Sequence, residues 1–244
     1  MIRQDFIPDR FRVLSGSMLK LIAVVSMFID HVGVHLVDQS IILLQFGTYK
    51  LTLYRLMRDL GRFAFPIFCF LLIEGFLHTR SKVRYGISLA VLAVISEIPF
   101  DLEHNGTFFY SEQNVFFTLL LGYLGLCAIA RFREKPLFAF LSLLELLVVC
   151  YYLNADYWVQ GFAFIILLYA LREQKLLKIF TAFLLNNFRF VLLAFLPIAL
   201  YNGKRGFIRG AFLKYLFYLI YPLHIFIIYL IKLNFIGFEY KKRL

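Results

Sequence analysis

Residues 18–37 read MLKLIAVVSMFIDHVGVHLV, an apolar run interrupted by a few polar side chains. An α-helix needs about 20 predominantly apolar residues to cross the hydrocarbon core of a bilayer. The run is too long for the apolar core of a signal peptide, and it lacks a small-residue cleavage site. It therefore predicts a retained transmembrane helix.

The composition of the whole chain also indicates a membrane protein. Of the 244 residues, 61% are hydrophobic and 17% are charged, whereas about 25% are charged in soluble domains. This excludes an ordinary cytosolic enzyme. The 30 Phe and 15 Tyr residues also exclude a disordered chain, which would have too little apolar surface to fold. No long linker or low-complexity tract divides the chain, so residues 1–244 are predicted to form a single domain.

Further apolar runs predict an all-α, polytopic integral membrane bundle of about eight or nine transmembrane helices. They cover residues 62–78, 85–98, 115–130, 137–153, 157–171, 176–185, 190–201 and 214–232. The runs on either side of residues 186–187 are short, so they are either two tilted helices or one broken helix. The mixed segment 41–59 predicts an amphipathic helix lying in the membrane interface.

Basic residues gather in alternate loops. The four basic loops contain Arg80, Lys82 and Arg84, then Arg131, Arg133 and Lys135, then Arg172, Lys175 and Lys178, and finally Lys204, Arg205 and Arg209. Because basic loops remain cytoplasmic, this pattern predicts that the four basic loops and the N-terminus lie in the cytoplasm. Basic residues in 50–62 and 241–243 fall on the outer side. Either these segments re-enter or follow the membrane, or one span is miscounted.

The net charge of +11 is explained by the cytoplasmic loops and by contact with the lipid bilayer, so no nucleic-acid partner is predicted. Cys69, Cys127 and Cys150 stand singly in apolar segments, and the sequence has no CxxC or His–Cys cluster. Neither a metal site nor a disulfide framework is therefore predicted. The sequence also has no Walker A, HExxH, GxSxG or Rossmann motif, which argues against ATP-driven transport and zinc proteolysis.

Two ionisable residues, Asp30 and His31, lie inside the first apolar run. A charge at the bilayer centre costs at least about 2.5–3.5 kcal/mol, so such residues are candidates for function. Lys20 precedes His31 by eleven positions, which places both on one face of a helix, about 16 Å apart. In the alternative interpretation, Lys20 only extends to the interface and His31 is a core histidine bonded to a neighbouring helix.

The second run contains Glu74 and His78, which are four positions apart and face the same way. Pro66 in the same run predicts a kink. Glu74 lies among apolar residues and needs a partner, which is either a site component or a side chain of another helix.

The third run ends at Pro99 and places two carboxylates, Glu97 and Asp101, at its outer rim. Asn114 opens the fourth run, where it either caps the helix or belongs to a site. Near the end of the chain, YNGKRG at 201–206 is a basic turn whose glycines permit close approach to a phosphate. By itself, such a loop is more often only a topology signal.

Several of these stretches together resemble the TraX family. They are LKLIA at 19–23, IDHVG at 29–33, GRFAFPIFCFLLIEGF at 61–76, SEIPFD at 96–101, NVFFTLLLG at 114–122, YNGKRG at 201–206 and KYLFYLIYPLH at 214–224. TraX proteins are polytopic inner-membrane proteins, and the founding member is implicated in N-terminal acetylation of conjugative pilin. They are also similar to membrane acyltransferases that acetylate sugars and carry a basic residue and a histidine eleven apart in the first helix. The basic residue there is Arg, where this chain has Lys20.

The resemblance implies acetyl-CoA as the donor and a pilin N-terminus or an envelope glycan as the acceptor. We expect His31 to act as general base, with Asp30 or another carboxylate orienting it and Glu74 as the alternative base. The expected cofactor-binding residues are Lys20, Arg62, Arg80, Lys82, Arg84, Asn202, Lys204 and Arg205. The expected substrate-binding residues are Glu97, Asp101, Asn114, Tyr221 and His224.

Two other classes of protein fit the same sequence. A small proton-coupled transporter or flippase would use Glu74 and His31 as a proton relay, although such proteins are commonly built from paired repeats and no convincing repeat is present. A non-catalytic pilus or envelope assembly factor would tolerate substitution of its intramembrane polar residues. The sequence leaves the acceptor and the oligomeric state open.

Overall fold

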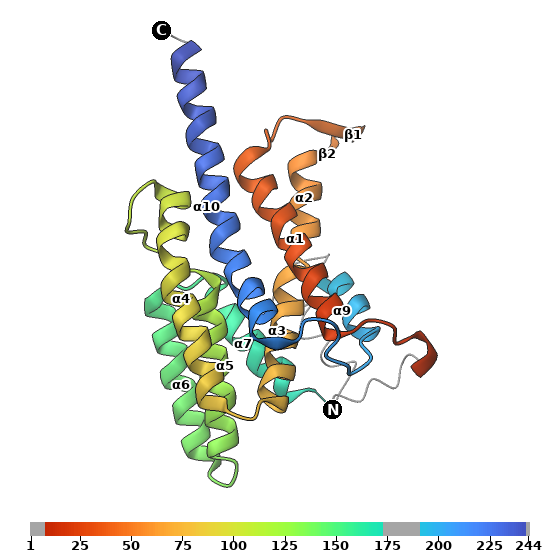
Figure 1. Ribbon diagram of the computed structural model, residues 1–244, viewed down its shortest axis with the longest axis vertical. Coiled ribbons are helices and arrows are strands. Elements are labelled where there is room, and N and C mark those ends of the chain that lie inside the picture. The colour runs from red at the N-terminus through yellow and green to blue at the C-terminus, as the bar shows by residue number, and fades with distance from the viewer. Residues whose placement is uncertain (1–7, 173–190, 243–244) are drawn as a thin grey trace.

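A computed structural model describes residues 8–172 and 191–242, and within these ranges the chain is a bundle of helices with one small hairpin (Figure 1). The predicted run 176–185 lies outside the described residues. The elements are η1 (Asp9–Phe11), α1 (Gly16–Leu36), β1 (Ile42–Phe46), β2 (Tyr49–Thr52), α2 (Leu53–Gly61), α3 (Ala64–His78), α4 (Lys82–Asn105), α5 (Val115–Arg131), α6 (Pro136–Leu153), α7 (Trp158–Ala170), α9 (Val191–Ala199) and α10 (Gly210–Lys242).

Side-chain caps begin several of the helices. The Ser15 hydroxyl accepts a hydrogen bond from the N–H of Met18 at the start of α1, at 3.3 Å. The Thr52 hydroxyl does the same for Arg55 at the start of α2, at 3.2 Å. Such caps satisfy backbone donors that have no partner within the helix. Helix starts are thus local, sequence-encoded features.

The core surrounds α3, which packs against α1, α5, α7 and α9. In the most apolar 18-residue stretch of the α2–α3 segment, 61% of the residues are buried inside the protein. In the corresponding stretch of α6, only 6% are buried. The outward side chains of α6 include Leu137, Phe140 and Leu144, all exposed. Exposed apolar side chains on a long apolar helix are typical of contact with lipid. The chain is therefore a helical, multi-pass membrane protein in contact with the bilayer.

The predicted number of eight or nine transmembrane helices is wrong for the described residues. Five segments there are long and apolar enough to cross a membrane: Gly16–Leu36, Leu53–His78, Lys82–Asn105, Pro136–Leu153 and Tyr215–Asn234. The apolar helices α5 and α7 are shorter, at 17 and 13 residues. The run predicted at 190–201 becomes the nine-residue helix α9. Apolar composition alone overestimates the spans because it also marks helices buried within a bundle.

The helix predicted at 41–59 is wrong for residues 42–52, and the helix begins only at Leu53. Ile42–Phe46 and Tyr49–Thr52 pair as an antiparallel hairpin, and α2 follows and packs against α1. Glycines permit the close approach: a Cβ on Gly61 would overlap the side chain of Asp30, and one on Gly33 would lie 2.8 Å from Cβ of Met57. Small residues at such crossings let helix backbones approach in membranes. The crossing places α2 directly beside Asp30.

Pro99 does not end the third apolar helix, contrary to the prediction. Helix α4 continues past it to Asn105, and Gly106 ends the helix with a left-handed φ of 69°. Prolines are tolerated inside membrane helices because the surrounding protein compensates for the lost hydrogen bond. The extra turn carries the buried Glu103 and the adjacent His104. Helix α10 packs against both α1 and α4, and its C-terminal end extends beyond the bundle (Figure 1).

Candidate functional site

A cavity of about 410 Å³ lies between α1, α2, α4, α10 and the segments around residues 112 and 156–160. Its apolar lining includes Phe100 and Ile225. Nine Asp, Glu, His and Arg side chains also line it: Asp30, His31, His35, Arg58, Arg62, Glu103, His104, Glu112 and Asp156. A cavity with several ionisable groups inside a membrane bundle is a candidate functional site.

Two histidines from distant parts of the chain meet at this cavity. His31 Nδ1 on α1 lies 2.6 Å from His224 Nε2 on α10, and the two rings are stacked, with centroids 4.8 Å apart. His224 Nδ1 lies 2.9 Å from the carbonyl oxygen of Ile220, so this nitrogen carries a proton and donates it. His224 Nε2 therefore accepts from His31 Nδ1–H, and the lone pair of His31 is on Nε2.

This contact agrees with the alternative interpretation of the sequence, in which His31 is a core histidine bonded to a neighbouring helix. It also fixes the tautomer of His31, which the sequence did not show. Tyr221 lines the cavity as well, with its ring centroid 6.4 Å from that of His31. Of the predicted substrate-binding residues, His224 thus contacts His31 and Tyr221 shares its cavity.

Asp30 has a different partner from the one predicted. Its Oδ2 accepts a hydrogen bond from Arg58 Nη1 at 2.6 Å, and both side chains are largely buried. The residue that orients His31 is thus His224, and Asp30 pairs with α2 instead. The reason is the close crossing of α1 and α2, which carries Arg58 to Asp30. The basic residues that broke the predicted topology, Arg58 and Arg62, both line the cavity.

Glu74, the predicted alternative base, does not line this cavity. It is buried on α3, lies 3.6 Å from His78 Nε2 and is hydrogen-bonded to the side chain of Tyr201. Tyr201 is therefore a partner of Glu74 from outside its own helix, one of the two possibilities that the sequence left open. It does not bring Glu74 and His31 together around one cavity.

The predicted outer-rim residues form a contact between α4 and α5. The Asn114 side chain accepts a hydrogen bond from Phe116 N at 3.0 Å and so caps α5. Its amide also donates to Glu97 Oε2 and, at 2.8 Å, to the carbonyl of Ala93. Asp101 is buried nearby on α4. None of Glu97, Asp101 and Asn114 lines this cavity. The bond from Phe116 N confirms the capping interpretation of Asn114.

The predicted cofactor-binding residues divide between two regions. Arg62 lines the cavity. The others belong to the start of α1, the start of α4 and the 201–206 loop, and five of them are exposed: Arg80, Lys82, Arg84, Lys204 and Arg205. The loop packs on the start of α1, where Gly16 N and Ser17 N donate to the carbonyls of Lys204 and Arg205. The Asn202 side chain accepts from Lys204 N at 2.9 Å, which shapes the turn.

A family model described as TraX protein matches residues 15–232. The chain belongs to the TraX family. Over 239 residues it is 29% identical to a probable fimbrial assembly protein FimC, serogroup H1, of Dichelobacter nodosus, a match that covers 86% of this chain and 93% of that protein. No solved structure matches the chain. The TraX resemblance drawn from the sequence motifs is therefore confirmed.

Sequence reasoning missed several ionisable residues of this TraX cavity, namely His35, Arg58, Glu103, His104, Glu112 and Asp156. One signal was available, because His35 follows His31 by four positions and so shares its helix face. No comparable signal marks Glu103 or Asp156, which lie in two different segments that hydropathy assigned to loops.

The carboxyl of Asp156, which lines this TraX cavity, has a pKa above its usual value. Burial raises the pKa of its carboxyl from 3.8 to about 6, and the hydrogen bond from Tyr157 N opposes part of that increase. The neighbouring Glu112 also raises this pKa, whereas His104 lowers it. Asp156 therefore changes charge near neutral pH at the wall of the cavity.

Replacing Asp156 with asparagine is expected to stabilise the protein at high pH only. A raised carboxyl pKa stabilises the fold fully below the unfolded-state pKa and loses that contribution as the pH rises through about 6. Asp156→Asn, which can still accept from Tyr157 N, should therefore match wild type near pH 4 and exceed its unfolding free energy by up to about 3 kcal/mol near pH 8. Unfolding of the detergent-solubilised protein at both pH values measures this difference.

Asp38 supplies a control of opposite sign. It is exposed, and its carboxylate accepts a hydrogen bond from Ser40 N at 2.8 Å, which lowers its pKa. Asp38→Asn should therefore lose stability at high pH, where the wild-type carboxylate is charged. A gain from Asp38→Asn, or an effect of Asp156→Asn that does not change with pH, would contradict the pKa assignment.

Proposed function

We propose that this protein is a membrane acetyltransferase that moves an acetyl group from acetyl-CoA to an amine or hydroxyl of a cell-envelope acceptor. The observation that carries the proposal is the hydrogen-bonded series from the Ile220 carbonyl through His224 to His31. It leaves a basic lone pair on His31 Nε2, at the wall of a cavity inside a membrane bundle. A base held in one tautomer by a second group is the arrangement that general-base catalysis needs.

The chain's own residues account for the proton in this reaction. His31 Nε2 takes the proton from the acceptor N–H or O–H while that atom bonds to the acetyl carbonyl carbon. The carbon–sulfur bond breaks, and the CoA thiolate leaves and recovers the proton from His31. Throughout, His31 Nδ1–H remains bonded to His224, which keeps the ring oriented and supports its charged form.

The basic residues at the start of α1 and α4 and in the 201–206 loop support acetyl-CoA as the donor. Exposed Lys and Arg side chains bind phosphate groups through charge-assisted hydrogen bonds. Lys20 on α1 lies about 16 Å from His31 along the helix, so the donor would have to extend along α1 to deliver its acetyl group. Its phosphates would stay with the basic residues.

The proposed acceptor is a pilus subunit presented through its N-terminal amine. The D. nodosus relative is described as a probable fimbrial assembly protein. Glu112 and Asp156 at the cavity wall favour an amine over an anionic acceptor, and the amine reacts in its neutral form, from which His31 removes one proton during attack. The same relative's description also supports a second candidate function, namely a pilus assembly factor without catalytic activity.

Transfer of label separates the two candidates. The full chain, purified and placed in lipid nanodiscs, is incubated with acetyl-labelled CoA and membranes from a strain that lacks this gene. The enzyme should transfer label to an envelope component, and mass spectrometry of that component should locate the acetyl group on an amine or a hydroxyl. Transfer no greater than that of empty nanodiscs would contradict the enzymatic proposal and favour the assembly factor.

A further inference from the structure

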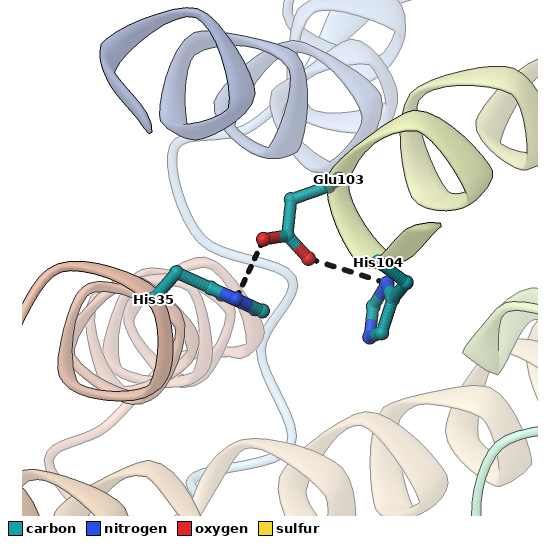
Figure 2. Close-up of side chains that lie close together, drawn as sticks. All are labelled: His35, Glu103 and His104. Atoms are coloured by element: carbon teal, nitrogen blue, oxygen red, sulfur yellow. Dashed lines mark ion pairs between the residues drawn. The ribbon is translucent and has the colours of Figure 1, made fainter. Parts of the chain in front are cut away.

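We propose that His35, Glu103 and His104 form a binding site for a divalent transition-metal ion, for which Zn²⁺ is the best match. Each residue offers one ligand atom, and the three atoms lie within 4.8 Å of one another. Figure 2 shows the carboxylate of Glu103 between the two imidazole rings, with His35 on α1 and the other two residues on α4. Two imidazoles and one carboxylate are a typical donor set for zinc sites that keep a fourth position open.

The distances require only a small adjustment to hold an ion. His35 Nδ1 lies 2.5 Å from Glu103 Oε1, and His104 Nδ1 lies 3.2 Å from Glu103 Oε2. In a tetrahedral site with metal–ligand bonds of about 2.0–2.1 Å, neighbouring ligand atoms are about 3.3 Å apart. Histidine rotamers and the neutral tautomer of each ring can supply this spacing, and metal binding displaces the proton that His35 shares with Glu103.

The second observation is the state of the Glu103 carboxylate. Its side chain is 1% exposed, and its Oε2 has no hydrogen-bond partner within the described part of the chain. The nearest nitrogen, His104 Nδ1, is 2.9 Å from the carbonyl of Phe100 and donates there. A buried carboxylate oxygen without a donor is costly, and a metal ion would satisfy it.

A cationic side chain, that of Lys232, contacts the Glu103 carboxylate through one of its two oxygens. Lys232 of α10 lies 3.4 Å from Glu103 Oε1 and donates to the Glu103 backbone carbonyl at 3.1 Å, so it approaches the carboxylate through Oε1 and leaves Oε2 without a donor. To bind an ion, His104 would take the neutral tautomer with its proton on Nε2, so that Nδ1 releases the Phe100 carbonyl and offers its lone pair beside Glu103. An ion here would link the ends of α1 and α4.

The site belongs to the same cavity as His31, since all three ligands line it. The His31 and His35 ring centroids are 6.2 Å apart. The fourth coordination position would therefore be open to the cavity, where an oxygen of a bound molecule or a water can complete it. This inference does not depend on the proposed acetyl transfer, because a metal at the cavity is equally compatible with an assembly factor.

Metal content and a spectroscopic probe test the site. The full chain is purified with an affinity tag that contains no histidine, stripped with a chelator and dialysed against Zn²⁺ or Co²⁺. We expect about one Zn²⁺ per chain, visible absorption of the Co²⁺ form typical of tetrahedral ligation, and a higher unfolding temperature with Zn²⁺. Substoichiometric binding together with an unchanged unfolding temperature would overturn the proposal and leave an ion-pair network with Lys232.

Variants separate this site from binding elsewhere. His104→Asn changes an exposed side chain, so it should fold, and it should weaken Zn²⁺ binding by more than about 100-fold. Glu103→Gln tests the buried ligand. His78→Asn is the matched control, because His78 is an exposed histidine of α3 that does not line this cavity. Wild-type affinity in His104→Asn, or equal losses in His104→Asn and His78→Asn, would overturn the assignment.

Discussion

Replacing His31 with asparagine is expected to lower the rate of acetyl transfer by about 10²–10⁴-fold, the range that a positioned general base contributes. Asparagine retains a side-chain N–H that can bond to His224 Nε2, so the contact between α1 and α10 survives while the basic lone pair is lost. The measurement is the initial rate of label transfer by nanodisc-embedded protein. A His31→Asn variant that retains most of the wild-type rate would remove His31 from the mechanism.

His224 is expected to act as a positioning residue, because it contacts His31 rather than the reacting atoms. His224→Gln should lower the rate less than His31→Asn does, and it should change the pH dependence of the rate because it alters the hydrogen bond at His31 Nδ1. A purely structural role would lower the rate equally at all pH values. His78→Asn, on α3 and outside the cavity, is the matched histidine control and should leave the rate unchanged.

Replacing Arg58 with methionine is expected to cost about 3–5 kcal/mol of unfolding free energy, because it leaves the buried Asp30 without its charge partner. The side chains of Asp30 and Arg58 are only 14% and 26% exposed. Methionine keeps most of the aliphatic volume, so the loss reports on charge rather than on packing. Denaturant titration of the detergent-solubilised protein measures the difference.

The double variant Asp30→Asn/Arg58→Met distinguishes this explanation from a general weakening of α2. Removing both charges should recover most of the lost stability, since the cost arises from an unpaired buried charge. Arg55→Met, at an exposed position on the same helix, should cost much less than Arg58→Met, because exposed charges contribute little to stability. If the double variant is as unstable as Arg58→Met alone, Asp30 is not the cause.

Much of the helical framework follows from the sequence because the determining signals are local. The run at 18–37 becomes α1, Gly16–Leu36, and the run at 137–153 becomes α6, Pro136–Leu153. The physical basis is that an apolar run of bilayer length must satisfy its backbone groups internally, which a helix does. The same reasoning singled out Asp30 and His31, since ionisable residues in such runs require a compensating interaction.

The number of spans and the hairpin at 42–52 were not predictable in this way. Helices such as α5 and α7 are as apolar as a membrane span but shorter, and hydropathy does not separate burial in protein from burial in lipid. The crossing of α1 and α2 depends on Gly33 and Gly61 fitting against Met57 and Asp30. That fit is a property of two surfaces, and neither segment reveals it alone.

The sequence by itself determined that this is a helical membrane protein of the TraX family. It also identified His31 as an ionisable residue inside an apolar run, and so as a candidate for function. Only the tertiary structure showed which of these side chains meet: His31 with His224, Asp30 with Arg58, and Glu103 with both His35 and His104. Apolar periodicity specifies that a helix forms and which residues share its face. Packing among helices that are far apart in the chain decides which faces come into contact. The ionisable side chains of the cavity lie close together because of those contacts.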